Sequence, residues 1–400
     1  MSPTGCTLIT ETRTRMRTIF CAVLFLAIAG TSLLEARASE GGRNSGQQNA
    51  AVKFLRADAS LRQSYPLPPD APAKLQQALQ SPLTEDDEKL VAAAEEALVE
   101  FRHGAALRRC DWVMSAEDGA LANTAHRGAM FELISVAGLR ARLRFRDGQA
   151  LGAIEDIVDA MAASRHLSVD GSLASVLFAY RLENALAQVL SANLGRLSPS
   201  QLETLADSVE KLPNGSSIAV AFEIEKTTRN DFEEIAKSAK SRDQIIEALL
   251  KYIPFLHSDR AQAAEVVDAC GGSVAGFRHC VDEQQSFYVS WVDRFQSPPD
   301  QFERAYQQEV GPLAKSNALI REFTPMLPRF RWTEAYTQTR RALLRAAIAV
   351  RMGGSEALAG YPDPYDGKPF AYSSLPNGFR LASQLSENGT QLTLNVAPQH

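Results

Sequence analysis

Apolar residues recur at helical spacing through the middle of the chain, and short turns interrupt them. Residues 150–167 are one such stretch, and its apolar face is made by Ala150, Ile154, Ile157, Met161 and Leu167. This spacing is typical of an amphipathic helix. Similar stretches cover 121–148, 173–195 and 199–212, and each is closed by Gly or Pro. Helices joined by such short turns predict antiparallel hairpins, stacked as a bundle or a short solenoid.

The period changes near residue 360, where short extended runs replace the helical pattern. The runs FAYSS, FRLASQL and TQLTLNV are separated by Asn377-Gly378 and Asn388-Gly389. Asn-Gly between extended runs is typical of a hairpin turn. The predicted fold class is therefore mainly α, with a small β-hairpin or meander in the C-terminal segment 361–400. The helical domain is predicted to cover 81–360, with a sub-boundary near 213–216.

The first 38 residues have the pattern of a secretory signal peptide. Arginines at 13, 15 and 17 precede the apolar run 19–30, and an Ala-Arg-Ala site follows at 36–38. We expect cleavage after Ala38, with Met16 as an alternative start, and an exported protein in the periplasm or outside the cell. No membrane span is predicted after the signal is removed. Residues 39–80 are polar and Pro-rich and predict a leader, with the helices beginning after the N-cap Thr84.

Composition and charge narrow the functional classes. Hydrophobic residues make up 45% of the 400 residues, which is enough for a sizeable core, and the formal net charge is −5. This mild acidity disfavours nucleic-acid binding, which needs concentrated positive charge. Cys270 and Cys280 are the candidate disulfide of an oxidising compartment, with Cys110 left over; the alternative is three buried thiols.

No motif of catalysis, metal binding or cofactor binding stands out. The chain lacks H-E-x-x-H, C-x-x-C, G-x-G-x-x-G and the P-loop pattern, so we predict neither a catalytic residue nor a cofactor. Arg140, Arg142, Arg144 and Arg146 alternate on one predicted helix. They are candidate contacts for a phosphate or an anionic glycan, or else arginines whose stems cover neighbouring residues.

The segment 363–372, DPYDGKPFAY, followed by Asn377-Gly378-Phe379, resembles the ending of a family of uncharacterised exported bacterial helical proteins. That resemblance implies helical hairpins before a terminal β-hairpin, and it implies no activity. The same segment is less closely similar to the C-terminal loop of type II secretion pseudopilins, but the calcium-binding acidic segment that follows in those proteins is absent from this chain. Asp363 and Asp366 themselves are a candidate cation pair, although two carboxylates alone make a poor Ca²⁺ site.

These patterns favour a non-catalytic binding or structural protein of the bacterial envelope. Its partner would be an unidentified protein or an envelope polymer. One alternative is a hydrolase that uses two carboxylates on an envelope glycan or peptide. Another is a component of a secretion apparatus. A cleft with two facing acids and no basic partner would favour the hydrolase.

Overall fold

The computed structural model describes residues 49–68, 70–112, 125–228, 230–252, 259–323, 327–387 and 389–396. The protein is mainly α-helical and carries a small antiparallel sheet near its C-terminus, as the sequence predicts. The predicted signal peptide, 1–38, lies outside the described residues. Among the described helices, none combines the length and the apolar character needed to cross a membrane.

The α-helices, in chain order, are α2 (Ala50–Ser64), α3 (Ala71–Ala78), α4 (Glu85–Ala93), α5 (Glu95–Ala105), α6 (Ala125–Arg146), α7 (Ala150–Ser168), α8 (Leu173–Asn193), α9 (Pro199–Glu210), α10 (Ile218–Thr228), α11 (Asn230–Ser238), α12 (Arg242–Tyr252), α13 (Arg260–Ala269), α14 (Val274–Trp291), α15 (Pro299–Ser316), α16 (Ala318–Phe323) and α17 (Leu327–Gly353). Short 3₁₀ segments are η2 (Leu194–Arg196), η4 (Val292–Gln296) and η5 (Ser355–Gly360). The strands are β1 (Ala371–Leu375), β2 (Gly378–Glu387) and β3 (Thr390–Val396).

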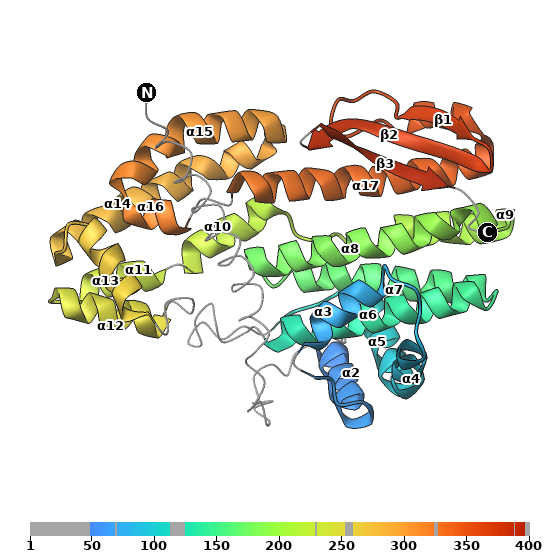
Figure 1. The fold of residues 1–400 in the computed structure, drawn as a ribbon, viewed down its shortest axis with the longest axis horizontal. Coiled ribbons are helices and arrows are strands. Elements are labelled where there is room, and N and C mark those ends of the chain that lie inside the picture. Colours follow the sequence, from blue (N-terminus) through green and yellow to red (C-terminus); the bar gives the residue numbers. More distant parts are fainter. Residues whose placement is uncertain are drawn as a thin grey trace, which may run out of the picture.

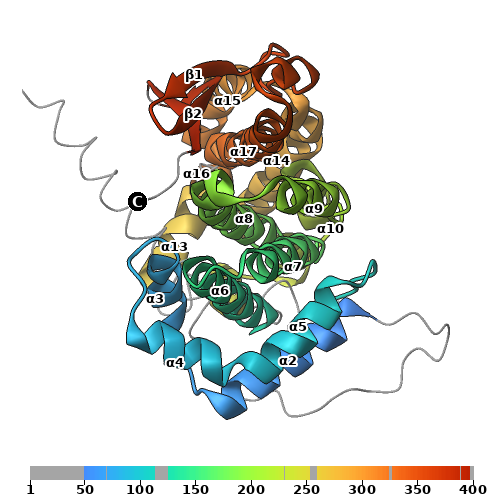
Figure 2. The same cartoon turned by 90° about the vertical axis from the view of Figure 1, so that its right-hand side faces the viewer.

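Four long helices stack side by side through the middle of the molecule. Helix α6 contacts α7, α7 contacts α8, and α8 contacts α17 (Figure 1). The sheet covers the outer side of α17, and α2 to α5 cover the outer side of α6 (Figure 2). These elements share one large apolar core, which runs from Phe54 on α2 to Val396 on β3. The predicted helical hairpins at 121–212 are therefore present as α6 to α9.

The N-terminal boundary of the helical domain differs from the prediction. The expectation that 39–80 is a leader outside the domain is wrong for α2 and α3, which pack into the main core. Phe54, Ala57 and Leu61 follow helical spacing on α2 and are almost fully buried. Prolines at 66 and 68 lie in the non-helical stretch between the two helices, whereas Pro72 lies in the first turn of α3, where a missing N–H leaves no hydrogen bond unmade. The N-cap Thr84 is confirmed, with a reciprocal hydrogen bond to Asp87.

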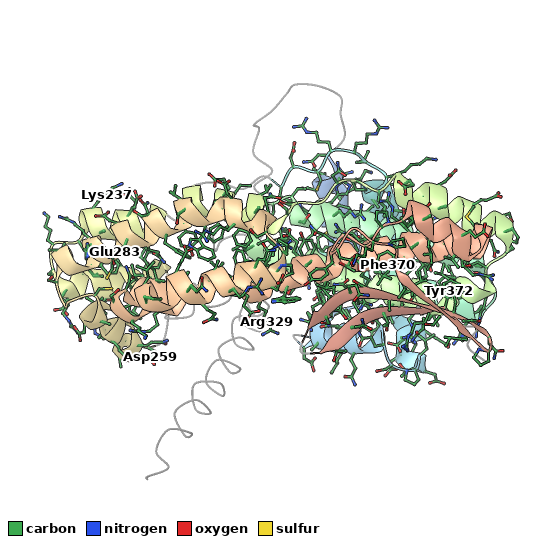
Figure 3. All side chains as sticks on the ribbon, turned by 90° about the horizontal axis from the view of Figure 1, so that it is seen from above. Lys237, Asp259, Glu283, Arg329, Phe370 and Tyr372 are labelled. Atoms are coloured by element: carbon green, nitrogen blue, oxygen red, sulfur yellow. The ribbon has the colours of Figure 1, made fainter. Side chains whose placement is uncertain are left out.

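Helices α10 to α16 form the other end of the molecule. The non-helical stretch 212–217, close to the predicted sub-boundary, separates these helices from α9. Helix α17, which follows them in the chain, packs in the main core again. An aromatic core lies between α10, α14 and α15, where the Trp291 ring meets Phe302 edge-on at 5.2 Å. A smaller core lies between α11, α12, α13, α14 and α16. In Figure 3, Glu283 of this end and Tyr372 of β1 lie toward opposite ends of the molecule.

The C-terminal sheet has the strand order β1-β2-β3, and both pairs are antiparallel. Asn377 and Gly378 lie at the first hairpin turn, as predicted, and β2 and β3 pack against α17. The second predicted turn is described only from Gly389, because Asn388 lies outside the described residues. The segment just before β1 folds into a tight loop, in which the Gly367 N–H donates to the Asp363 carbonyl. The predicted meander is therefore confirmed.

Candidate functional site

A cavity of about 240 Å³ opens where α7, α8 and α17 meet the segment between α9 and α10. We call it the Glu183 pocket, after the buried glutamate in its wall. Its most unusual feature is its charge, since it is lined by Arg165, Arg340, Arg341 and Arg345 but by only two acids, Glu183 and Glu210. Four guanidiniums against two carboxylates leave an excess of two positive charges. Such an excess favours an anionic ligand.

The pocket is built from segments far apart in the sequence. Helix α7 contributes Met161 and Arg165, which lie one helical turn apart on the same face. Helix α17 contributes Arg341 and Arg345 by the same spacing, with Arg340 beside them. Helix α8 contributes Glu183 from its buried side. Because these long helices pack in the main core, the charged groups are carried by a rigid framework.

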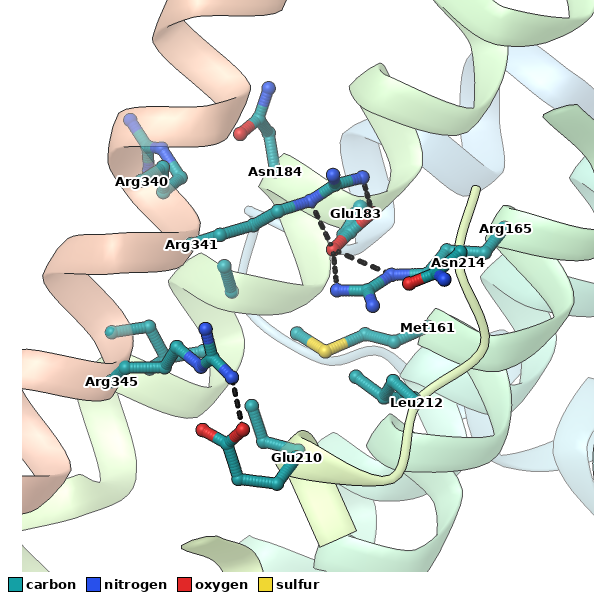
Figure 4. A pocket seen from close by; sticks show the side chains of 13 residues that line it. Met161, Arg165, Glu183, Asn184, Glu210, Leu212, Asn214, Arg340, Arg341 and Arg345 are labelled. Atoms are coloured by element: carbon teal, nitrogen blue, oxygen red, sulfur yellow. Dashed lines mark hydrogen bonds and ion pairs between the residues drawn. The ribbon is translucent and has the colours of Figure 1, made fainter. Parts of the chain in front are cut away.

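Glu183 is held between two arginines from opposite sides of the pocket (Figure 4). Its carboxylate accepts a hydrogen bond from Arg165 (Nη2–Oε1 2.8 Å) and another from Arg341 (Nε–Oε1 2.7 Å). Only 3% of the side chain is exposed. Burial would by itself raise the pKa of Glu183, but the two arginines outweigh it and hold that pKa below its usual value. Glu183 is therefore a carboxylate at neutral pH.

A hydrogen-bond network around the Glu334 carboxylate lies next to the pocket. The Tyr180 hydroxyl donates to Glu334 (Oη–Oε1 3.0 Å), and the Ile218 N–H donates to the same carboxylate oxygen at 2.9 Å. Burial raises the pKa of Tyr180, so its hydroxyl remains a donor. Asn184 joins α8 to α17 through a hydrogen bond to Thr337 (Nδ2–Oγ1 2.9 Å). These contacts fix α8 against α17 and thereby fix Glu183 against Arg341.

Arg340 is the least engaged of the pocket arginines. Its Nε is buried and has no hydrogen-bond partner within the described part of the chain. Its Nη2 makes one long contact with the Tyr336 hydroxyl, at 3.4 Å, and the guanidinium lies over the Tyr336 ring. Arg345, at the rim, forms an ion pair with Glu210. Arg340 therefore forms no ion pair with a carboxylate of the described chain, unlike Arg165, Arg341 and Arg345.

The arginines that the sequence singled out lie elsewhere, on α6, and each one contacts an acceptor of the protein. Arg140 binds Asp156 through two hydrogen bonds, at 2.8 and 3.1 Å, and also pairs with Glu95. Arg144 pairs with the same Asp156. Arg142 donates to a backbone carbonyl, and Arg146 pairs with two acids at the surface. Their proposed contact with an anion stays a prediction.

The other predicted site residues also have protein partners. The Asp363 carboxylate is buried and accepts hydrogen bonds from Ser383 (2.6 Å), from the Gln384 N–H and from the Tyr365 N–H. Asp366 is exposed and accepts from the Lys368 N–H. Both carboxylates thus serve the loop itself. In the described part of the chain no three His, Cys, Asp or Glu residues are grouped to hold a metal ion.

The three cysteines of the described chain are free thiols in this structure. Cys270 and Cys280 are buried in the small core, whereas Cys110 is half-buried near the start of α2. The predicted disulfide between Cys270 and Cys280 is therefore not formed in this structure.

Sequence reasoning missed the Glu183 pocket, although one signal was available. Glu183 interrupts the buried face of α8, and a charged residue there requires a partner. Nothing in the sequence identifies Arg165 and Arg341 as those partners, because they lie on other helices. Comparison with protein-family models, with curated proteins and with solved structures finds no match to this chain.

Proposed function

We propose that this protein is an exported, non-catalytic binding protein of the bacterial envelope, and that it holds an anionic group in the Glu183 pocket. The observation that carries the proposal is the excess positive charge of the cavity, where Arg340 forms no ion pair with a carboxylate of the described chain, unlike Arg165, Arg341 and Arg345. A carboxylate or phosphate group bound in the cavity would supply an anionic partner for this guanidinium. The ligand would be a small anion or an acidic group of an envelope glycan or peptide.

The pairing of the two acids supports binding over hydrolysis. Hydrolysis of a glycoside by two carboxylates requires one of them to carry a proton that it can donate. Glu183 has a lowered pKa and two arginine partners, so it does not suit the role of a proton donor at neutral pH. Glu210 pairs with Arg345. The hydrolase alternative predicts two facing acids without basic partners. Both acids of this pocket have arginine partners instead.

A thermal-shift series tests the proposal on the full chain. The probes are inorganic phosphate, the acidic sugars N-acetylmuramate and glucuronate, and neutral N-acetylglucosamine as the uncharged control. A ligand present at a hundred times its Kd stabilises the folded state by about 2.7 kcal/mol, which is readily detected. We expect at least one anion to raise the melting temperature and the neutral sugar to have no effect.

The matched variants are Arg340→Gln, in the pocket, and Arg351→Gln, an exposed position of the same helix. The first should abolish the shift and the second should retain it. If no anion stabilises the wild type, or if Arg340→Gln responds like the wild type, the proposal is wrong. Release of a new product from the acidic sugar or from an envelope glycan would instead support the hydrolase alternative.

A further inference from the structure

The corner between α13 and α14 reverses the chain within a few residues. Helix α13 is capped by Cys270, and Gly271 and Gly272 follow with φ of +87° and +63°, a conformation that favours glycine. Ser273 then caps α14 by accepting from the Gly276 N–H at 3.1 Å. The first turn of α14 consequently lies against the end of α13. A Cβ on Gly276 would lie 2.1 Å from the Cys270 carbonyl oxygen.

This corner brings the two cysteines together. Cys280 follows Gly276 by four residues, so it lies one turn further along the face of α14 that contacts Cys270. Both side chains are buried, each with 4% exposure, in the same small core. The neighbouring Cys270 thiol lowers the pKa of the Cys280 thiol. Cys280, together with burial, raises the pKa of Cys270.

Helix α16 holds the thiol pair from a third side. The Asn317 side chain is fully buried, and its amide donates to the Cys280 carbonyl at 2.9 Å. Its oxygen accepts from the Ile320 N–H at 3.1 Å, which ties the start of α16 to α14. The Ala318 N–H faces the Cys280 sulfur and the Leu319 N–H faces the Cys270 sulfur. Two N–H donors aimed at sulfur favour the thiolate form that reacts with disulfides.

We propose that Cys270 and Cys280 are a redox pair that closes into a disulfide between α13 and α14, with a small-molecule disulfide as the oxidant. The Cys280 thiolate attacks one sulfur of the external disulfide, breaks its S–S bond and releases one thiol. Cys270 then loses its proton and attacks the Cys280 sulfur of the mixed disulfide, releasing the second thiol. Two protein thiols are oxidised to one disulfide, and the external disulfide is reduced to two thiols. This inference does not depend on the Glu183 pocket.

Peptide mapping of the full chain tests the pair directly. The protein is incubated with oxidised glutathione, denatured, alkylated with iodoacetamide and digested with trypsin. Because Arg278 lies between the cysteines, trypsin separates Cys270, in 261–278, from Cys280, in 279–294. We expect these two peptides to be recovered joined, two hydrogen masses lighter than their sum, and to separate after reduction with dithiothreitol.

Two variants make the result specific. Cys110→Ser should still yield the joined peptides, since that thiol is not part of the pair. Cys280→Ser should yield 261–278 with an alkylated or glutathione-bearing Cys270 and no joined species. Recovery of both wild-type peptides in singly modified form after the incubation would overturn the proposal, whatever the variants do. Joining of either peptide to the Cys110 peptide would overturn it as well.

Discussion

The protein contains two arginine clusters on neighbouring helices, and they differ in the balance of charge. Around Asp156 on α7, three arginines (102, 140 and 144) meet four acids (Glu95, Glu155, Asp156 and Asp159). In the Glu183 pocket the ratio is reversed, with four arginines and two acids. In the first cluster every arginine is shared between carboxylates or with a backbone carbonyl.

This difference sets the ionisation of the buried acids. Burial raises the pKa of Asp156, and it raises that of Asp159 to about 6, because the nearby arginines do not fully offset the loss of water. Burial acts on Glu183 in the same sense, but Arg165 and Arg341 outweigh it and lower its pKa. An arginine-rich helix alone therefore does not identify an anion site. What matters is whether the guanidiniums outnumber the acids that they contact.

The largest expected effect is a difference in unfolding free energy between two variants, each of which lacks one arginine of one cluster. Arg140→Gln leaves Asp156 buried with weaker compensation, and breaking such a pair costs about 3–5 kcal/mol of unfolding free energy. Arg340→Gln removes a guanidinium whose Nε has no partner, so we expect little change in stability. Urea unfolding of both variants at neutral pH measures this. Similar losses for both variants would remove the distinction between the clusters.

A buried carboxylate with no arginine gives the intermediate case. Asp363 accepts three hydrogen bonds, all from neutral donors. In Asp363→Asn a side-chain NH₂ group replaces one of the two accepting oxygens and cannot accept the hydrogen bonds made to it. We expect the free energy of unfolding to fall by about 2 kcal/mol. Asp366→Asn, at an exposed position of the same loop, is the matched control and should unfold like the wild type. Equal stability of Asp363→Asn and the wild type would show that this carboxylate does not hold the loop.

The smallest effect is a gain in stability, and it depends on pH. The pKa of Asp159 is raised from 3.8 to about 6 on folding, so the folded state binds its proton more tightly than the unfolded state. Its contribution to stability therefore falls as pH rises through this range. Asp159→Asn should be more stable than the wild type at pH 8, by about 1–2 kcal/mol, and equal to it near pH 4. A loss of stability at pH 8 would contradict the shared-arginine explanation.

The sequence predicts the helices and the sheet because their signals are local. Helical spacing identifies α6 to α9, and the Asn377-Gly378 turn identifies the first hairpin. Helix α2 was missed because a polar segment precedes it and prolines follow it, although its spacing of Phe54, Ala57 and Leu61 is helical.

The sites could not be predicted in the same way, because charge compensation is not local. The alternating arginines of α6 are conspicuous in the sequence, yet the acids that engage the two innermost, Arg140 and Arg144, belong to α5 and α7. The pocket arginines are inconspicuous and come from α7 and α17, with Glu183 between them. Only the packing of these helices shows which group of arginines keeps a positive excess.

Calorimetric titration tests the central claim, that the Glu183 pocket binds an anion through Arg340. The most stabilising anion of the thermal-shift series is titrated at low salt into the wild type, Arg340→Gln and Arg351→Gln. We predict saturable binding to the wild type and to Arg351→Gln, and an affinity at least about tenfold lower for Arg340→Gln, because charge-assisted hydrogen bonds are lost. Equal affinities for the wild type and Arg340→Gln would contradict the account.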